Sequence, residues 1–127
     1  MMPKFITLQA VLAMQDEQIE EFGGKRGVRD PDMLDSALGQ AQSTYAYTED
    51  LHETAAQYCV SLTKDHAFID GNKRIAADCM LTFLIINGFE PTMAPDTLFN
   101  KIMQVTVGEI KRPELAEFLR INTINYQ

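Results

Sequence analysis

Nine consecutive residues near the middle of the chain combine several side chains that can do chemistry. They are His66-Ala67-Phe68-Ile69-Asp70-Gly71-Asn72-Lys73-Arg74. An imidazole exchanges its proton near neutral pH, which suits His66 to act as a general base. Asp70 offers the hard carboxylate oxygen that Mg²⁺ prefers beside bound phosphates. Phe68 is expected to anchor the segment in the core.

The end of this segment is expected to bind an anion. Gly71-Asn72 lies where a loop should enter a helix, and the first turn of a helix leaves several N–H groups unpaired at an electropositive end. A glycine there lets a phosphate approach the backbone closely. Lys73 and Arg74 add two cations at the same end, where positive charge is unfavourable unless an anion offsets it. The pattern therefore predicts a bound polyanion.

The same residues also have an ordinary structural interpretation. Asp70 could be a plain helix N-cap, Lys73 and Arg74 a solvated surface pair, and His66 a loop histidine packed on neighbouring helices. The residue types and their spacing, taken alone, leave the chemical and the structural interpretations about equally open.

Apolar periodicity predicts that helices surround and position this segment. The strongest helix starts are Thr7, Asp30 followed by Pro31, and Asp50 with Glu53 three residues later. We expect six helices, over residues 7–21, 31–41, 50–64, 72–87, 96–107 and 113–122. Residues 42–49 and 89–92 are expected to be connections, with a strand conceivable only around residues 43–48.

The helix over residues 72–87 is apolar almost all round, so it is expected in the middle of the bundle. Its polar stripe consists of Arg74, Asp78 and Thr82, and Arg74 can pair with Asp78 one turn later. The sequence thus predicts one all-α domain over residues 1–127, a compact bundle of about six helices around a central apolar helix that follows the loop.

Composition narrows the class of protein. The chain has 18 acidic and 11 basic residues and a net charge of -7, which disfavours direct binding of nucleic acid. We find no apolar run of the roughly 20 residues that span a bilayer and no signal-peptide core, so we expect no membrane association and a cytoplasmic location. Cys59 and Cys79 are expected to be buried, reduced thiols.

Residues 66–74 closely resemble the signature of the Fic/Doc superfamily, H-x-F-x-D/E-G-N-G/K-R, and specifically that of its death-on-curing (Doc) toxin branch. The resemblance extends to Phe22-Gly23-Gly24, to residues 27–30 and to Leu51-His52-Glu53, so it covers nearly the whole chain. It implies an all-α fold in which the signature loop leads into a central helix.

The resemblance also implies a role for each residue of the signature. His66 would deprotonate the hydroxyl of a target protein, Asp70 would coordinate Mg²⁺ on the phosphates of ATP, and Phe68 would be structural. The implied catalytic residues are His66, Asp70 and Arg74, and the implied phosphate-binding residues are Gly71, Asn72, Lys73 and Arg74. Tyr45 and Tyr47 would belong to a flap that clamps the target segment.

Two positions bear on the type of reaction. Most Fic proteins, which transfer AMP, have glycine where this chain has Lys73, whereas the Doc branch has lysine there and resembles a kinase in which the reversed nucleotide presents its γ-phosphate. Gly71 instead matches the common Fic signature and differs from Doc, which has alanine at this position. The resemblance implies transfer of the γ-phosphate to a Ser or Thr hydroxyl, with AMP transfer, or a catalytically idle binding module, as alternatives.

The resemblance further implies a toxin that acts on a component of translation. Many Fic proteins restrain themselves with an inhibitory helix carrying S/T-x-x-x-E-G/N, but no glutamate of this chain is followed by Gly or Asn. We therefore expect an antitoxin supplied in trans, with a glutamate that reaches Arg74. We expect His52 to have a surface or helix-packing role. Lys25, Arg26 and Arg29 are expected to cap helix ends or to pair with acidic neighbours.

Overall fold

The protein, seen in a computed structural model that describes residues 2–126, is mostly helical. Those residues form α1 (Leu8–Phe22), α2 (Pro31–Thr48), α3 (Leu51–Asp65), α4 (Asn72–Ile86), β1 (Phe89–Pro91), α5 (Pro95–Thr106), α6 (Arg112–Ile121) and β2 (Thr123–Asn125). The predicted all-α class is confirmed, and five of these six helices agree with the prediction to within one residue at each end. None of the helices in the described range is long and apolar enough to cross a membrane.

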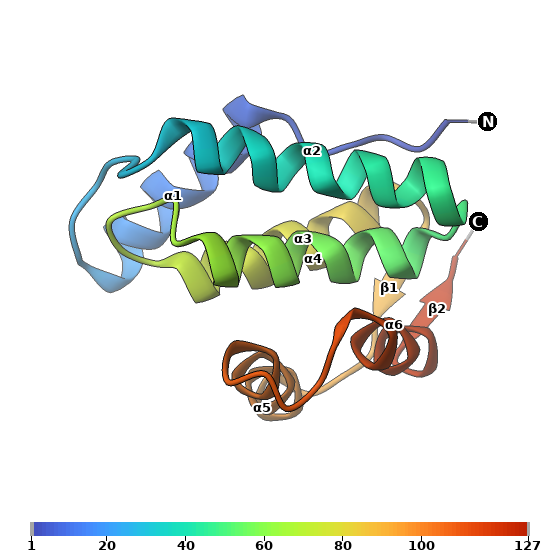
Figure 1. Cartoon of the computed structure of the whole chain (residues 1–127). Helices are drawn as coiled ribbons and strands as arrows, with labels where there is room; N and C mark the ends of the chain where they lie inside the picture. The colour runs from blue at the N-terminus through green and yellow to red at the C-terminus, as the bar shows by residue number, and fades with distance from the viewer. Residues whose placement is uncertain (1, 127) are drawn as a thin grey trace.

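Helix α3 lies at the centre of the bundle, where it packs against α2, α4, α5 and α6 (Figure 1). The sequence predicts α4 in this place because α4 is almost entirely apolar, yet Ile85 and Ile86 of α4 are exposed. Helix α3 instead buries small polar residues such as Thr54 and Thr63, whose hydroxyls donate to carbonyls one turn earlier. Because each hydroxyl is satisfied within the helix, the polar residues cost little when buried.

Capping bonds confirm the three predicted helix starts. The side chains of Thr7, Asp30 and Asp50 accept backbone N–H groups in the first turns of α1, α2 and α3. Gly23 ends α1 with a φ of 81° and donates its N–H to the carbonyl of Ile19. The capping residues therefore set where the first three helices begin.

The predicted connection over residues 42–49 is wrong, because α2 continues to Thr48. Ala41 and Thr44 extend the buried face of α2 against α3. The hydroxyls of Thr44 and Thr48 donate to carbonyls four residues earlier, which keeps these polar residues compatible with a helix. The chain turns only at Glu49, which adopts a left-handed φ of 52°.

Two short strands were also not predicted. Strands β1 and β2 pair antiparallel with Phe89 opposite Asn125 and Pro91 opposite Thr123, so the segment expected as a loop over residues 89–92 is partly a strand. His52 of α3 packs its ring edge-on to Phe89, and its Nε2 lies 3.0 Å from Thr123 Oγ1. The sequence predicts a surface or helix-packing role for His52; its ring instead packs against the two strands and so links the small sheet to α3.

The N-terminal segment is held by a buried tyrosine. The hydroxyl of Tyr58 accepts the backbone N–H of Ile6 at 3.0 Å, and burial raises the pKa of Tyr58 to about 12. Tyr58→Phe should lower the free energy of unfolding by about 1–3 kcal/mol, because it leaves a buried N–H without a partner. Denaturant unfolding followed by circular dichroism measures this change. Tyr47→Phe is the matched control, since Tyr47 is 92% exposed, and an equal loss in both variants would refute the assignment.

Candidate active site

The loop of residues 66–71, here called the motif loop, joins α3 to α4 at one end of the bundle, beside the connection between α1 and α2 (Figure 1). His66 ends α3 with a left-handed φ of 48°, and Gly71 precedes α4 with a φ of 83°. Phe68 between them is fully buried, which confirms its predicted anchoring role. The two backbone turns leave His66 and Asp70 exposed.

The start of α4 is the electrostatic feature of the site. Its N-cap is Gly71, and no side chain caps it. The amide of Asn72 turns back to the loop instead, accepting the N–H of Phe68 at 3.0 Å and donating to its carbonyl at 2.9 Å. Asn72 therefore fixes the shape of the loop with its side chain, while the first backbone N–H groups of α4 stay available to an anion.

Asp70 is not the N-cap of α4, so its purely structural interpretation as a cap is excluded. Its Oδ2 accepts the backbone N–H of Lys25 at 2.9 Å, which leaves its other oxygen for a ligand. Gly24 allows this approach, because a Cβ there would lie 3.2 Å from the same Oδ2. The backbone of the α1–α2 connection thus holds the carboxylate of Asp70 in place.

The two cations of the motif are not neutralised by protein carboxylates. Within residues 2–126, no salt bridge involves Lys73 or Arg74, and the expected Arg74–Asp78 pair does not form. The guanidinium of Arg74 lies over the ring of Phe22, 4.4 Å from its centroid. Asp78 accepts a hydrogen bond from Gln18 instead, and burial raises the pKa of Asp78. The guanidinium of Arg74 therefore remains available to bind an anion.

One cavity of about 350 Å³ brings the predicted site residues together. Its lining includes His66, Asp70, Lys73 and Arg74, with the exposed ring of Phe99 from α5 at its edge. A base, a carboxylate and two cations thus surround an uncapped helix N-terminus. This arrangement can bind phosphate groups and can take a proton from a hydroxyl beside them.

Sequence reasoning missed the segment that supports the motif loop, which is the connection between α1 and α2; none of its residues lines the motif cavity. Its backbone runs antiparallel to the motif loop: Val28 forms a bridge with Phe68, Ile69 N–H donates to Gly27 O, and Arg29 N–H donates to Ala67 O. Only the resemblance over residues 22–24 and 27–30 pointed to this segment. A single isolated bridge between two loops leaves no alternating pattern in the sequence, so periodicity could not reveal it.

Arg26 and Arg29 act as expected, whereas Lys25 contributes its backbone N–H to Asp70 and its side chain forms no salt bridge within residues 2–126. Arg29 donates to the carbonyl of His66 at 2.7 Å and so caps the end of α3, and Arg26 pairs with Asp16 at 3.7 Å. Both contacts stiffen the segment beside the motif loop without entering its cavity.

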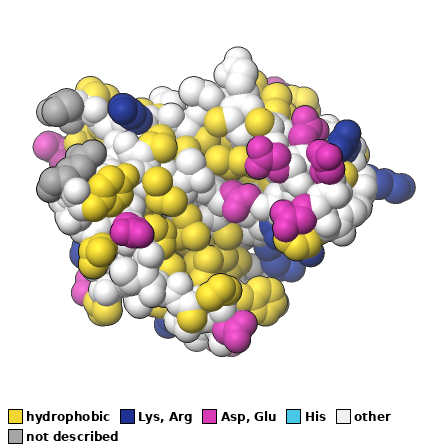
Figure 2. Space-filling view, turned by 180° about the vertical axis from the view of Figure 1, so that it is seen from behind, with side chains coloured by type: hydrophobic (Ala, Val, Ile, Leu, Met, Phe, Trp, Pro, Cys, Tyr) yellow, Lys and Arg dark blue, Asp and Glu magenta, His cyan; other side chains and the backbone are white. Residues whose placement is uncertain are grey.

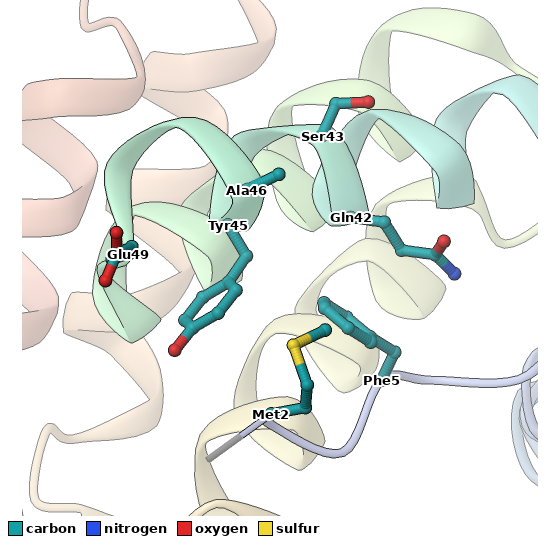
Figure 3. Close-up of a pocket in the computed structure, with 7 residues that line it drawn as sticks. All are labelled: Met2, Phe5, Gln42, Ser43, Tyr45, Ala46 and Glu49. Carbon is teal, nitrogen blue, oxygen red and sulfur yellow. The ribbon is translucent and has the colours of Figure 1, made fainter.

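Tyr45 and Tyr47 are not brought to the motif loop. Both lie in the last turns of α2, whereas the first residues of α2 lie beside Ala67. With a rise of about 1.5 Å per residue, Tyr45 is roughly 20 Å along the helix from that end. Figure 3 shows Tyr45 beside Met2 and Phe5, and its ring meets Phe5 edge-on at 6.1 Å. The structure does not support the prediction of a flap at these tyrosines, because a continuous helix carries them away.

The two cysteines take no part in the site. Cys59 and Cys79 are both buried, and burial raises the pKa of each thiol to about 12. Both thiols therefore stay protonated at neutral pH, which makes them poor nucleophiles, and the expectation of buried, reduced thiols is confirmed.

Comparison with known proteins agrees with the geometry. A family model described as "Fic/DOC family" matches residues 5–84, which include the α1–α2 connection and the whole motif. The chain belongs to the Fic/Doc family. It is 34% identical over 119 residues to "Protein kinase doc" of Escherichia phage P1, covering 92% of this chain and 94% of that protein. It is 44% identical over 73 residues to "Toxin Doc" of Mycolicibacterium smegmatis, covering 54% and 55% of the two chains.

Removing the Asn72 side chain tests how the loop is held. Asn72→Ala deletes both bonds to Phe68 and should speed hydrogen exchange at the Phe68 amide by about 5–150-fold, equivalent to about 1–3 kcal/mol of local opening. Exchange measured by NMR or mass spectrometry reports the change. Asn100→Ala, at an exposed position of α5, is the matched control. Unchanged protection of Phe68 would show that Asn72 does not fix the loop.

Proposed function

We propose that this protein transfers the γ-phosphate of ATP to a Ser or Thr hydroxyl of another protein, as a Doc-like toxin. The observation that carries the proposal is the motif cavity, in which His66, Asp70 and two unpaired cations surround the uncapped start of α4. The chain's similarity to a protein named "Protein kinase doc" supports phosphate transfer. The resemblance of the signature supports a component of translation as the target.

In this proposal His66 takes the proton of the acceptor hydroxyl. The hydroxyl oxygen forms a bond to the γ-phosphorus while the bond from that phosphorus to the ADP oxygen breaks. The products are a phosphorylated protein, ADP and a protonated imidazole. The backbone N–H groups of Gly71 and Asn72, with Lys73 and Arg74, hold the phosphate oxygens and offset their charge.

Mg²⁺ fits this site through Asp70. Among the described residues no group of three or more His, Cys, Asp or Glu side chains is placed to hold a metal, so the protein supplies few ligands itself. One carboxylate together with nucleotide phosphates and water is a common way to bind Mg²⁺. Bound there, the ion would neutralise phosphate charge, and Asp70 is held ready for it by the N–H of Lys25.

Position-specific labelling tests the reaction. The protein is incubated with Mg²⁺, a bacterial lysate freed of nucleotides, and ATP labelled at either the γ- or the α-phosphate. We expect protein labelling from γ-labelled ATP only. His66→Ala should reduce this labelling about 10²–10⁴-fold while ATP still binds, because the imidazole acts on the hydroxyl. Label from the α-phosphate would establish AMP transfer, and no label from either would favour an idle binding module.

Arg74 and Phe22 should act together on ATP. Arg74→Ala removes a charge-assisted contact and should weaken ATP binding by about 1.5–3 kcal/mol. Phe22→Ala removes the ring beneath the guanidinium and should weaken binding by about 0.5–1 kcal/mol. Calorimetric titration of the two single variants and the double variant forms a cycle. Phe22→Ala should have no effect in the Arg74→Ala background, and full additivity would show that Phe22 does not act through Arg74.

We further propose that an antitoxin controls the site in trans. The similar "Toxin Doc" is named as a toxin, and Arg74 of this chain is exposed and forms no salt bridge with any carboxylate of the described residues. The face seen from behind shows a broad apolar area with acidic side chains at its side (Figure 2). A segment that folds on binding suits this role: a glutamate would pair with Arg74, and apolar and basic residues would complement an acidic chain with exposed apolar surface.

Expression in bacteria tests the toxin and its control. The chain alone should arrest growth, and co-expression with the product of its neighbouring gene should restore it. His66→Ala should abolish the arrest without the partner, since the harm comes from catalysis. Unimpaired growth with the chain alone would argue against a toxin.

A further inference from the structure

A second cavity, of about 480 Å³, adjoins His66 on the side of α5 and α6. Its walls are the last turns of α3, the end of α5, and the connection over residues 107–111, and we call it the α3–α6 cavity. Apolar side chains form much of the lining: Val60, Val105, Val107 and Ile110. All but Val107 also pack against the core, so most of this lining is part of the folded structure and not loose surface.

His66 and Thr63 line both this cavity and the motif cavity. Thr63 is buried and its hydroxyl donates to the carbonyl of Cys59, so it is part of the floor. His66 is exposed and stands at the boundary of the two spaces. The proposed general base is therefore accessible from both cavities.

The geometry of phosphoryl transfer indicates which reactant lies on each side of the transferred phosphate. The attacking and leaving oxygens lie roughly in line, on opposite sides of the phosphorus. The attacking hydroxyl must lie within hydrogen-bond reach of His66, so the chain that carries the hydroxyl approaches from the His66 side. The rest of the nucleotide departs on the opposite side. The α3–α6 cavity lies next to His66 and is therefore placed for the acceptor, not for the nucleoside.

The charge of this cavity is opposite to that of the whole chain. Its lining holds Lys64, Lys111 and Arg112 and no carboxylate, although the chain carries a net charge of -7. Arg112 is paired with Glu53 at 2.9 Å, but no salt bridge among residues 2–126 involves Lys64 or Lys111. Asp65, beside Lys64 and His66, lies outside the lining but interacts with both of them electrostatically. An apolar floor with two cations that form no salt bridge is still complementary to an apolar side chain flanked by acidic groups.

We propose that the α3–α6 cavity binds the acceptor protein: it takes an apolar side chain within about three residues of the modified hydroxyl, while Lys64 and Lys111 face acidic groups of the acceptor. The inference rests on the proposed function and adds the location and chemistry of acceptor selection. The α5–α6 part of the cavity lies beyond residues 5–84, the segment that the family model matches.

Two variants test the proposal in the full chain. Val107→Trp fills the cavity from a position that is 63% exposed, and Lys111→Glu reverses the charge of an exposed residue at its edge. Lys4→Glu, at an exposed position of the N-terminal segment, is the matched charge control. For each protein, transfer from γ-labelled ATP to the proteins of a bacterial lysate is quantified, ATP affinity is measured by calorimetry, and folding is checked by circular dichroism.

We expect Val107→Trp and Lys111→Glu each to reduce protein labelling at least fivefold while ATP affinity stays within twofold of wild type. Lys4→Glu should change neither. Raising the salt concentration should slow labelling by the wild type more than by Lys111→Glu, because the charge contact is screened. Mapped labelled sites should carry an apolar residue within three positions of the hydroxyl.

Labelling at the wild-type level in both variants would overturn the proposal. A parallel loss of ATP affinity would also overturn it and would place the nucleoside in the α3–α6 cavity. If the wild type binds ATP but labels no protein, the proposed transfer itself fails and this inference falls with it. The two failures are distinguishable, because only the first leaves wild-type labelling intact.

Discussion

The candidate site depends on how helix α4 begins. Its first backbone N–H groups have no side-chain cap, and Asn72, which could have supplied a capping amide, is committed to Phe68. Lys73 and Arg74 then add positive charge where the helix dipole is already positive. A glycine N-cap in place of a capping side chain costs only about a few tenths of a kcal/mol, and each cation at this helix end costs about 0.3–1 kcal/mol. A bound phosphate offsets both costs, so the strain in the empty protein becomes affinity for the ligand.

The rest of the fold keeps that helix start open. Helix α3 carries His66 at its end, and the α1–α2 connection holds the motif loop from the other side through backbone bonds and the Lys25–Asp70 contact. Phe22 gives Arg74 a ring to lie on instead of a carboxylate to pair with. Neutralising groups such as Asp78 are engaged elsewhere. Polar groups that would ordinarily stabilise a helix are arranged here around the proposed phosphate site.

Sequence patterns predicted the parts of the fold that follow local rules. Caps at Thr7, Asp30 and Asp50 and helix-length apolar periodicity gave most element bounds, because those signals act within one or two turns. The errors arose where contacts between residues far apart in the sequence determine the length or burial of an element. Because Thr44 is polar, the sequence does not show that the buried face of α2 continues past Ala41. Small polar residues likewise make α3 look less buried than it is. In both helices the hydroxyl groups donate hydrogen bonds to backbone carbonyls, which only the structure shows. The two three-residue strands form because they pair with each other, and so short a pair leaves no signal in the sequence.

The residues of the site could be predicted from the sequence, but the contacts that hold them in place could not. The types and spacing of residues 66–74 indicated a base, a carboxylate and an anion site, and the structure places them around one cavity. The sequence could not show that Asn72 bonds back to the loop, that Phe22 lies beneath Arg74, or that residues 24–29 pair with the motif loop. Each of these depends on tertiary contact between segments that are 38 or more residues apart in the sequence, or on the exact turn of a short loop.

The most direct test of the account is to watch the backbone amides of the start of α4 while ATP and Mg²⁺ are added. In a titration followed by ¹H–¹⁵N NMR, the amides of residues 71–74 should shift first and most, and tripolyphosphate should shift the same amides. The amides at the end of α2, around Tyr45, should not move. Saturable binding that leaves residues 71–74 unshifted would contradict the central claim that this uncapped helix start is the phosphate site.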